Sequence, residues 1–219
     1  MTVLRAADAY HAWAPHYATE TAVSRLEAFT VDALVLPVRC DWLLDVGCGL
    51  ARRLQGTTAT NAVGVDLVPR MLQHATVQVP CAAADVRALP FADASFDMVW
   101  CRLVIGHLAE LDVAYAELTR VCRRGGTVLV TDFHSAAVAA GHRRTFTDES
   151  GSTHEIEHFV HTPEAHAAAA RRAGLALAAR EDGAVSPPIR SFYEDAGRLH
   201  RYEEQLGLPL VLACVYRVP

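Results

Sequence analysis

The sequence predicts an α/β fold with a doubly wound, mostly parallel seven-stranded sheet. Seven short apolar runs alternate along the chain with segments of helical spacing. The runs are apolar throughout rather than at every second residue, which is typical of strands buried on both faces. The chain has 219 residues, of which 52% are hydrophobic, so we expect a single domain with a sizeable core.

The first two predicted strands end at a glycine or an aspartate, which can terminate a strand or contact a ligand. Residues 42–46 end at Gly47, and residues 62–65 end at Asp66. The other strands are predicted at residues 81–84, 96–100, 127–131, 175–179 and 210–218. Right-handed crossovers bring the carboxyl ends of parallel strands to one edge of a sheet, where ligands bind in such folds.

Helices are predicted between the later strands from spacing and end signals. Residues 113–123 place apolar side chains at helical spacing before a pair of glycines. Residues 162–174 open with threonine as N-cap and proline in the first turn. Residues 191–207 open with the capping-box spacing of Ser191 and Glu194.

Composition and charge exclude several kinds of protein. The formal net charge of -5 leaves no basic footprint for nucleic acid. No apolar run reaches the roughly 18 residues of a membrane span, and residues 1–14 lack the apolar segment of a signal peptide. Six cysteines without a C-x-x-C pair favour reduced thiols and a cytoplasmic location.

Carboxylates close the first three predicted strands, at Asp45, Asp66 and Asp85. Gly47 and Gly49 follow the first of these and allow the backbone to approach a ligand closely. A single carboxylate at a strand end is often only a helix N-cap. Three of them in register with a Gly-x-Gly turn indicate a binding site.

The charges at this edge favour an adenosine that carries no phosphate. Asp45 would repel a pyrophosphate beside the glycine turn and attract an ammonium or sulfonium group. Asp66 offers two acceptor oxygens to ribose hydroxyls, and Asp85 can accept from the amine of adenine. S-adenosylmethionine has all of these groups. A nicotinamide-dependent oxidoreductase remains an alternative, although Arg52 stands where its third glycine is expected. A second alternative is a protein that binds S-adenosylmethionine but does not catalyse methyl transfer.

Four segments carry a family pattern. Residues 43–52 read LLDVGCGLAR, residues 63–72 VGVDLVPRML, residues 84–102 ADVRALPFADASFDMVWCR and residues 117–133 ELTRVCRRGGTVLVTDF. Together they resemble the class I S-adenosylmethionine-dependent methyltransferases, particularly the small-molecule group (type 11) with ubiquinone- and biotin-pathway enzymes. The resemblance implies a Rossmann-like methyltransferase fold and methyl transfer to an oxygen, carbon or nitrogen of a small-molecule metabolite.

The resemblance also implies which residues contact the cofactor. Asp45, Gly47 and Gly49 would hold the methionine part, and Asp66 the ribose. Leu67, Met71, Asp85 and Val86 would contact the adenine. Cys101 and Arg102 would lie near the sulfonium.

The chain departs from the family pattern at three places. Ala51 replaces a usual glycine in the first turn, and we expect it to fit as a helical residue. The stretch from Gly49 to Asp66 is short, so the first helix is expected to span about one or two turns. Arg124 replaces the usual proline before the glycine pair. None of these changes removes an implied cofactor contact.

Histidine is the natural base for a hydroxyl or activated-carbon acceptor near pH 7. His107 follows the fourth predicted strand and His134 ends the fifth, so both are catalytic candidates at the binding edge. His107 has a simpler alternative as a loop residue that caps the next helix.

Residues 154–160 alternate histidine with apolar side chains, which predicts one strand of a hairpin that turns at residues 149–152. The hairpin is expected to cap the site, with His158 touching the substrate, and a solvated surface is the alternative. Its histidines lack the ligand spacing of a zinc site, so no metal is expected.

Residues 10–17 read YHAWAPHY and resemble the Y-x-x-W-A-x-x-Y opening that forms a lid helix in such methyltransferases. Tyr10 and His16 are then expected to face the substrate, and Tyr17 is a further catalytic candidate. The alternative is that Trp13 and Tyr17 merely anchor the segment to the domain.

One methyltransferase domain is therefore predicted over residues 1–219. Its parts are an N-terminal lid (residues 1–36), a cofactor-binding core (37–135), an inserted cap (136–161) and the C-terminal part of the sheet (162–219). We expect a monomer or homodimer whose partner is a small molecule, and neither nucleic acid nor membrane.

Overall fold

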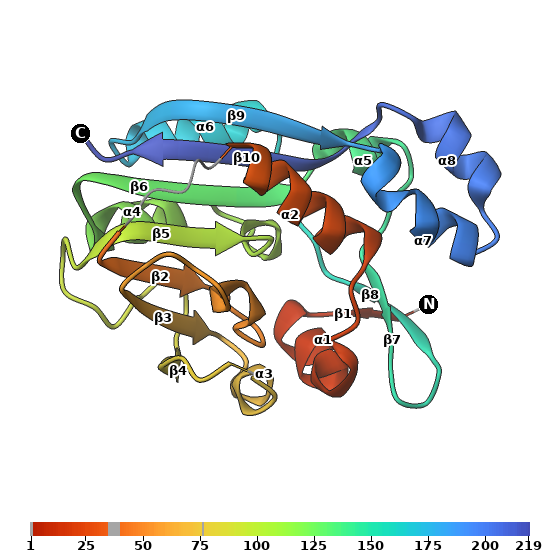
Figure 1. Cartoon of the computed structure of the whole chain (residues 1–219), viewed down its shortest axis with the longest axis horizontal. Coiled ribbons are helices and arrows are strands. Elements are labelled where there is room, and N and C mark those ends of the chain that lie inside the picture. The colour runs from red at the N-terminus through yellow and green to blue at the C-terminus, as the bar shows by residue number, and fades with distance from the viewer. Residues whose placement is uncertain (1, 35–39, 76) are drawn as a thin grey trace.

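Within the described residues, six of the seven strands of the large sheet run in one direction, so their carboxyl ends meet at one edge. A computed structural model describes residues 2–34, 40–75 and 77–219. The strand order is β4-β3-β2-β5-β6-β10-β9. In this order the strands are β4 (Cys81–Ala83), β3 (Asn61–Asp66), β2 (Trp42–Val46), β5 (Phe96–Arg102), β6 (Cys122–Phe133), β10 (Pro209–Arg217) and β9 (Ala176–Ala184). Only β10 runs against its neighbours, so the predicted mostly parallel sheet is confirmed (Figure 1).

The order of the strands reverses between β2 and β5. From β2 the chain proceeds outward to β3 and β4, and it then returns to β5 on the other side of β2. In doubly wound sheets such a reversal opens a crevice at the carboxyl edge. This reversal positions the site described below.

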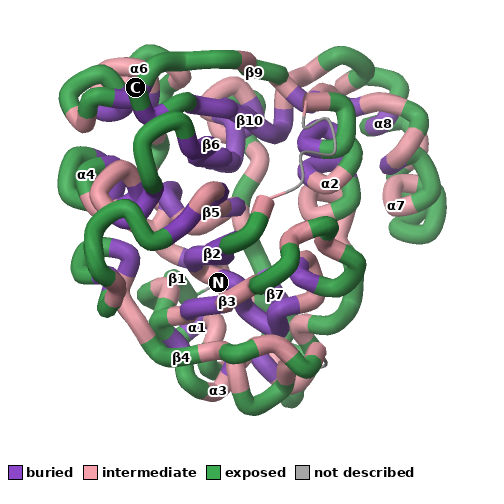
Figure 2. Tube along the Cα trace, turned by 60° about the vertical axis from the view of Figure 1, so that its left-hand side comes forward, coloured by how far each residue is buried: buried purple, intermediate pink, exposed green. Residues whose placement is uncertain are grey.

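Helices cover both faces of the large sheet. Helix α2 (Ala22–Leu34) contacts β9 and β10 on one face, and helices α4 (Asp112–Val121) and α6 (Pro163–Arg172) lie on the other (Figure 1). Side chains of β6 alternate accordingly, since Leu129 packs with α2 whereas Val128 and Val130 pack with α4. Double coverage explains why the inner strands are apolar. Figure 2 shows β2, β6 and β10 largely buried, whereas the edge strand β9 is mostly exposed.

A second sheet of three short strands lies beside the carboxyl edge. The strands are β1 (Thr2–Leu4), β7 (Thr145–Thr147) and β8 (Thr153–Ile156). β7 and β8 form an antiparallel hairpin whose turn contains the predicted residues 149–152, and β1 adds to β8 in parallel. The remaining elements are α1 (Ala6–Trp13), η1 (Ala14–His16), η2 (Arg52–Leu54), α3 (Pro69–Gln73), η3 (Ile105–His107), α5 (Ser135–Ala139), η4 (Pro187–Ile189), α7 (Arg190–Asp195) and α8 (Leu199–Gln205).

Several predicted elements have other bounds, and two of them end early for a clear structural reason. The strand predicted over residues 154–160 ends at Ile156, because the Phe159 N–H donates to the Gly106 carbonyl and draws the chain toward η3. The helix predicted over residues 113–123 ends at Val121, because Cys122 already pairs with β5.

The helix predicted over residues 191–207 is two helices, α7 and α8. Gly197 lies in the break with φ +65°, a left-handed conformation that ends a helix. The predicted capping box is also wrong, since Ile189 is the N-cap of α7 and Ser191 lies inside the helix.

Ala51 is not helical, contrary to expectation. It has φ 57° in the left-handed region and is completely buried at the start of η2. The single 3₁₀ turn of η2 stands where a helix of one or two turns was predicted. With so few residues before β3, the chain closes the connection by a tight turn, and Ala51 takes up a conformation that favours glycine.

A buried ion cluster joins α2 to the large sheet. Glu27 is fully buried and accepts from Arg102 at 2.7 and 2.9 Å, from Thr131 Oγ1 at 2.9 Å and from Arg53 at 3.4 Å. Burial alone would raise the pKa of Glu27, but the two guanidinium groups outweigh it and lower the pKa to about 2. The cluster thus fixes Arg102 at the end of β5.

Glu27→Gln is expected to lower the free energy of unfolding by about 3 kcal/mol near pH 7, because it leaves two buried cations without a carboxylate. Glu20→Gln, in an exposed pair with Arg25 at 3.8 Å, is the control and should change stability little. The lowered pKa means that the stability from Glu27 is present above about pH 4.5 and is lost as the pH falls toward 2. Urea unfolding over this range measures both effects, and equal stabilities at pH 7 would contradict the role of the cluster.

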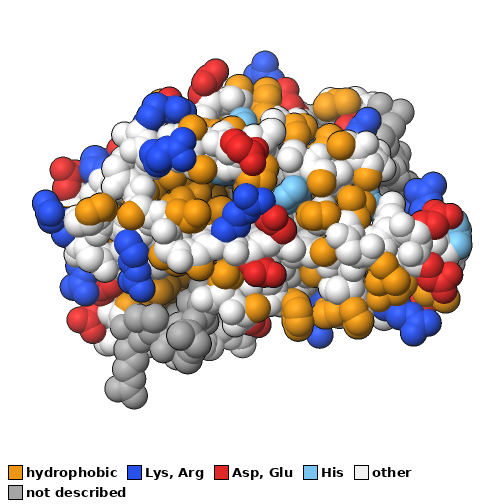
Figure 3. All heavy atoms as spheres, turned by 90° about the horizontal axis from the view of Figure 1, so that it is seen from above, with side chains coloured by type: hydrophobic (Ala, Val, Ile, Leu, Met, Phe, Trp, Pro, Cys, Tyr) orange, Lys and Arg blue, Asp and Glu red, His pale blue; other side chains and the backbone are white. Residues whose placement is uncertain are grey.

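Within the described ranges, no helix combines the length and apolar character that a bilayer crossing requires. On the face that Figure 3 shows, acidic and basic side chains are interspersed and do not gather by sign.

Candidate active site

A cavity of about 710 Å³ opens at the carboxyl edge where the strand order reverses. Its walls come from the ends of β2, β3 and β5, from the segments after β4 and β5, from α1 and from residues 157–159. The sequence-predicted residues that line it are Tyr10, Tyr17, Gly47, Asp66, Leu67, Asp85, Val86, Arg102 and His107.

The glycine turn after β2 is tightly packed. Gly47 has φ +73°, and a Cβ atom there would lie 2.1 Å from Cγ2 of Val104, so a larger residue would clash. The N–H groups of Gly47 and Cys48 both donate to the Val65 carbonyl, at 2.7 and 2.9 Å. These bonds tie the turn to β3 and leave its outer surface facing the cavity.

Asp66 lies at the end of β3 and lines the cavity. Its two oxygens accept from the N–H groups of Gly49 and Val68, each at 2.8 Å. Burial raises its pKa, and the two backbone bonds oppose this effect. Each carboxylate oxygen has a second acceptor position, so Asp66 can still bind two ribose hydroxyls.

Asp85 lies nearer the mouth of the cavity. It forms an ion pair with Arg87 at 2.6 Å and accepts from the Arg87 N–H, which lowers its pKa. Val86 and Leu67 add apolar surface to the same wall. This wall suits a flat, largely apolar ring with polar edges, such as adenine.

Asp45 is the most unusual group at this edge. Its side chain is fully buried, and neither oxygen has a hydrogen-bond partner among the described residues. Burial raises its pKa to about 6, although Arg53 and Arg102 oppose this effect. A buried carboxylate without a donor is costly. Asp45 itself does not line the cavity. The ammonium group of S-adenosylmethionine would supply the donor that its buried oxygens lack, so the residues present fit this cofactor.

Asp45→Asn is expected to stabilise the unliganded protein by about 1–2 kcal/mol near pH 7 and to weaken binding of S-adenosylmethionine about tenfold. The raised pKa means that stability from the protonated Asp45 is full below about pH 4 and is lost as the pH rises through about 6. The stabilisation should therefore vanish at pH 4. Thermal unfolding and calorimetry test both parts, with Asp41→Asn at the exposed start of β2 as the control. Lower stability of Asp45→Asn at pH 7 would contradict the argument.

His107 is held in one tautomer. Its Nδ1 lies 3.0 Å from the Glu157 carbonyl, which can only accept, so Nδ1 carries the proton. Its Nε2 then accepts from the Tyr10 hydroxyl at 3.1 Å, and Arg144 donates to that hydroxyl at 2.9 Å. Burial, and then the charge of Arg144, lower the pKa of His107 to about 3, whereas burial raises that of Tyr10. The imidazole is therefore neutral, with a lone pair beside the cavity.

Cys101 does not line the cavity, contrary to expectation. Successive side chains of β5 point to opposite faces, and Arg102 takes the face toward Glu27 and the cavity. Cys101 is fully buried in the core between β5 and α4, where burial raises the pKa of its thiol.

His134 and His16 also lie away from the cavity. His134 caps α5 by accepting from the Ala136 N–H at 3.0 Å, and its Nε2 lies 3.8 Å from Asp182 on β9. His16 is exposed in η1. Both histidines were predicted from chain position alone, and the side chains point elsewhere.

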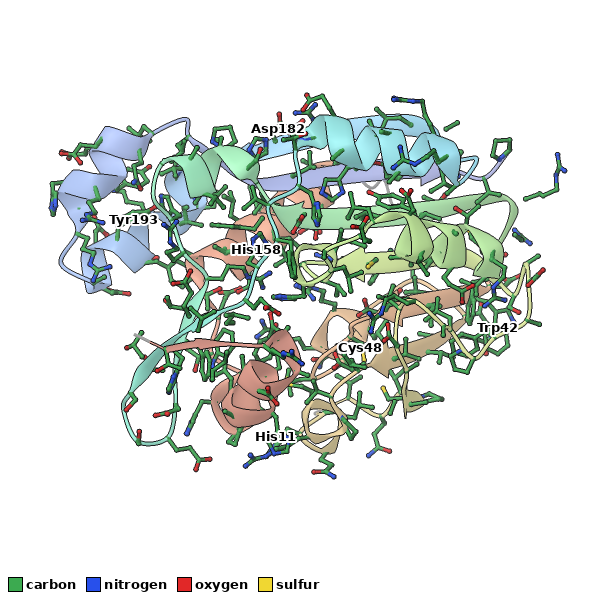
Figure 4. The ribbon with its side chains drawn as sticks, turned by 180° about the vertical axis from the view of Figure 1, so that it is seen from behind. His11, Trp42, Cys48, His158, Asp182 and Tyr193 are labelled. Carbon is green, nitrogen blue, oxygen red and sulfur yellow. The ribbon has the colours of Figure 1, made fainter. Side chains whose placement is uncertain are left out.

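His158 lies behind η3 rather than in the cavity wall. Its Nε2 is 3.6 Å from Oδ1 of Asp132, and a Cβ on Gly106 would lie 2.2 Å from it. Figure 4 shows His158 near the centre of the molecule, far from His11 on the outer side of α1. Met71 and Gly49 likewise do not line the cavity, since Met71 packs beneath the glycine turn with Val68 and Leu50.

Several lining residues have no counterpart among the predictions. Leu103 follows β5 with φ +60°, and its N–H donates to both oxygens of Thr131 at 3.0 Å. Arg144 does not line this cavity, and no motif in the sequence singles it out. Only its contact with Tyr10, far away in the chain, shows a role at the site.

The fold and the cavity at its carboxyl edge are typical of the class I S-adenosylmethionine-dependent methyltransferases. Residues 44–130 match the family described as methyltransferase domain. Malonyl-[acyl-carrier protein] O-methyltransferase of Dechloromonas aromatica is 33% identical over 171 residues, 74% of this chain and 62% of the relative. The enzyme of that name from Erwinia pyrifoliae is 40% identical over 92 residues, 40% of this chain and 35% of the relative.

The structure of an S-adenosylmethionine-dependent methyltransferase from Mesorhizobium loti superposes with a TM-score of 0.66 at 19% identity, over 88% of this chain and 97% of that one. Residues 44–130 of the chain match this methyltransferase family, and the comparisons support S-adenosylmethionine as the cofactor. The chain spans between a third and three fifths of the length of the two curated relatives. The nicotinamide-dependent and non-catalytic alternatives gain no support from these comparisons.

Proposed function

We propose that the protein transfers a methyl group from S-adenosylmethionine to a small-molecule acceptor in the 710 Å³ cavity. One observation carries this proposal. The cavity brings the cofactor-type groups Gly47, Asp66 and Asp85 together with the Tyr10–His107 pair. The first set suits the cofactor, and the second can remove a proton from the acceptor.

S-adenosylmethionine, when bound, supplies a methyl group on a positively charged sulfur. In this proposal Asp45 and the glycine turn hold its amino-acid part, Asp66 its ribose, and Asp85 its adenine. Holding donor and acceptor in line supplies much of the acceleration of such a displacement, up to roughly 7–11 kcal/mol in favourable cases.

The Tyr10 hydroxyl is placed to relay a proton. It donates to Nε2 of His107 and accepts from Arg144, which leaves one lone pair toward the cavity. An acceptor hydroxyl can donate to this lone pair while Tyr10 passes its own proton to His107. The Glu157 carbonyl, which accepts from Nδ1, stabilises the imidazolium that results.

We propose that residues 2–17 act as a lid and residues 136–161 as a cap. Of the rest of the predicted lid, residues 22–34 form α2 against the large sheet, and residues 1, 35 and 36 lie outside the described ranges. The lid assignment is supported by α1, which lines the cavity with Arg5, Ala6 and Tyr10. The cap assignment is supported by Glu157 and Phe159 in the cavity wall and by the pairing of β1 with β8. This pairing ties the proposed lid to the proposed cap, so the two would move together.

The proposal is tested by measuring cofactor binding and methyl transfer in separate experiments. Calorimetry should show binding of S-adenosylmethionine and of its demethylated product, and the product should raise the melting temperature whereas nicotinamide dinucleotides should not. Labelled methyl transfer is then measured with acceptors that offer a hydroxyl, a carboxylate, an amine or an activated carbon. Binding without transfer to any class would favour the non-catalytic alternative.

The finer properties complete the proposal. The acceptor atom is an oxygen, carbon or nitrogen, and the protein is a monomer or homodimer that does not act on nucleic acid. All six cysteines are free thiols, which supports action in the reducing cytoplasm.

A further inference from the structure

A second cavity, of about 130 Å³, adjoins the active site and shares Tyr17 and Leu103 with it. Three arginines line the second cavity, Arg52, Arg143 and Arg144, and no carboxylate does so among the described residues. The main cavity differs, because its walls contain four acidic side chains, those of Asp66, Asp85, Glu110 and Glu157. A cavity with cations alone is notable in a chain of net charge -5.

The three guanidinium groups keep donors to spare. Arg52 donates to the Ala18 carbonyl at 3.0 Å and lies over the Tyr17 ring. Arg144 donates to the Tyr10 hydroxyl and weakly to the Leu103 carbonyl at 3.4 Å, and in the described structure neither arginine has a carboxylate partner. Arg143 lies 3.6 Å from Glu155. Since each guanidinium has five N–H donors, most of them remain free.

Hydroxyl groups and apolar side chains complete the walls. Thr19, Thr21, Ser24 and Thr145 contribute hydroxyls, and Trp13, Val23, Phe133 and Ile156 contribute apolar surface. Planar guanidinium forks and hydroxyl donors together form the donor set that binds phosphate or carboxylate oxygens. The apolar surface suits the carbon skeleton that carries such a group.

The cationic lining continues outward. A third cavity, of about 300 Å³, shares Arg143 with the second and is also lined by Arg198 and Arg201. Throughout the described ranges, no acidic residue lines it either. The second cavity therefore lies between the active site and the third cavity, and guanidinium groups line both of the outer two.

We propose that the arginine-lined cavity binds the anionic group, a phosphate or a carboxylate, of the methyl acceptor. This inference rests on the proposed function and names the substrate class, an anionic small molecule. Arg144 couples the two cavities, because the same guanidinium holds the Tyr10 hydroxyl and faces the anion. An acceptor seated on Arg144 thus places its reactive atom beside Tyr10.

The test uses two probes, inorganic phosphate and malonate, titrated into protein saturated with S-adenosylhomocysteine at constant ionic strength. We expect saturable binding of at least one probe, and the tighter of the two identifies the anion as phosphate or carboxylate. Arg144→Gln and Arg52→Gln should each weaken it at least tenfold, as expected for loss of a charge-assisted hydrogen bond. Arg143→Lys keeps the charge but loses the planar fork, and should weaken binding less.

The control is Arg171→Gln, which removes one exposed charge from α6 outside all three cavities. The proposal is overturned if neither probe binds the wild-type protein, or if Arg144→Gln and Arg171→Gln bind it equally well. Affinity for S-adenosylhomocysteine shows that each variant is folded. Because the readout needs no turnover, absence of methyl transfer with every acceptor would contradict the proposed function but not this inference.

Discussion

Asp66→Ala is expected to weaken binding of S-adenosylmethionine about a thousandfold, near 4 kcal/mol. The substitution removes a charged acceptor for two ribose hydroxyls, and each such hydrogen bond is worth about 1.5–3 kcal/mol. It also frees the N–H groups of Gly49 and Val68, so the glycine turn loses one of its bonds to β3. Isothermal calorimetry measures the loss.

Two further variants of this kind separate affinity from folding. Asp66→Asn keeps the shape of the side chain and one acceptor oxygen, so its affinity should lie between those of the wild type and Asp66→Ala. Asp112→Ala removes an exposed carboxylate that pairs with Arg172 outside the cavity, and should bind as the wild type does. If Asp66→Ala is folded and binds with unchanged affinity, the ribose assignment is wrong.

His107→Ala is expected to lower the rate of transfer to a hydroxyl acceptor about a hundredfold. This is the low end of the roughly 10²–10⁴ that a positioned base contributes, because the lowered pKa of His107 makes it a weak base. Tyr10→Phe should also lower the transfer rate, because it removes the hydroxyl that donates to His107 in the proposed proton relay. Single-turnover kinetics with labelled cofactor measure both rates. Affinity for S-adenosylhomocysteine should change little in either variant.

The pH profile gives a second readout of His107. Its pKa of about 3 keeps the imidazole neutral across the physiological range, so the rate should not fall around pH 6.5 as the pH is lowered from about 8 to about 5. His134→Ala and His16→Ala, which lie away from the cavity, are the controls and should keep the wild-type rate. An unchanged rate in His107→Ala would exclude the base.

The cofactor half of the site was largely predictable. Asp66, Asp85 and Gly47 line the cavity as expected because each ends or follows a strand, and strand ends follow from local apolar runs. A parallel sheet then brings those ends to one edge whatever the loops between them do. Asp45 shows the limit of this reasoning, since its complete burial without a partner depends on the packing around it.

The acceptor half was predicted less well. His107, His134 and His158 have similar positions in the sequence, near strand ends or in the hairpin, yet only His107 lines the cavity. Which way a side chain points at a strand end depends on its partners, such as the Asp182 side chain near His134 and Asp132 near His158. Those partners lie far away in the chain.

By itself, the sequence predicted the class of fold, the cofactor and the edge of the sheet where the cavity lies, because apolar runs, turns and acidic strand ends are local patterns. The tertiary structure alone decided the rest. The pairing of β1 with β8, the contact of Arg144 with Tyr10 and the conformation of Ala51 join or constrain distant parts of the chain. Such contacts form only when the whole chain packs, and they shape the side of the site where the acceptor would lie.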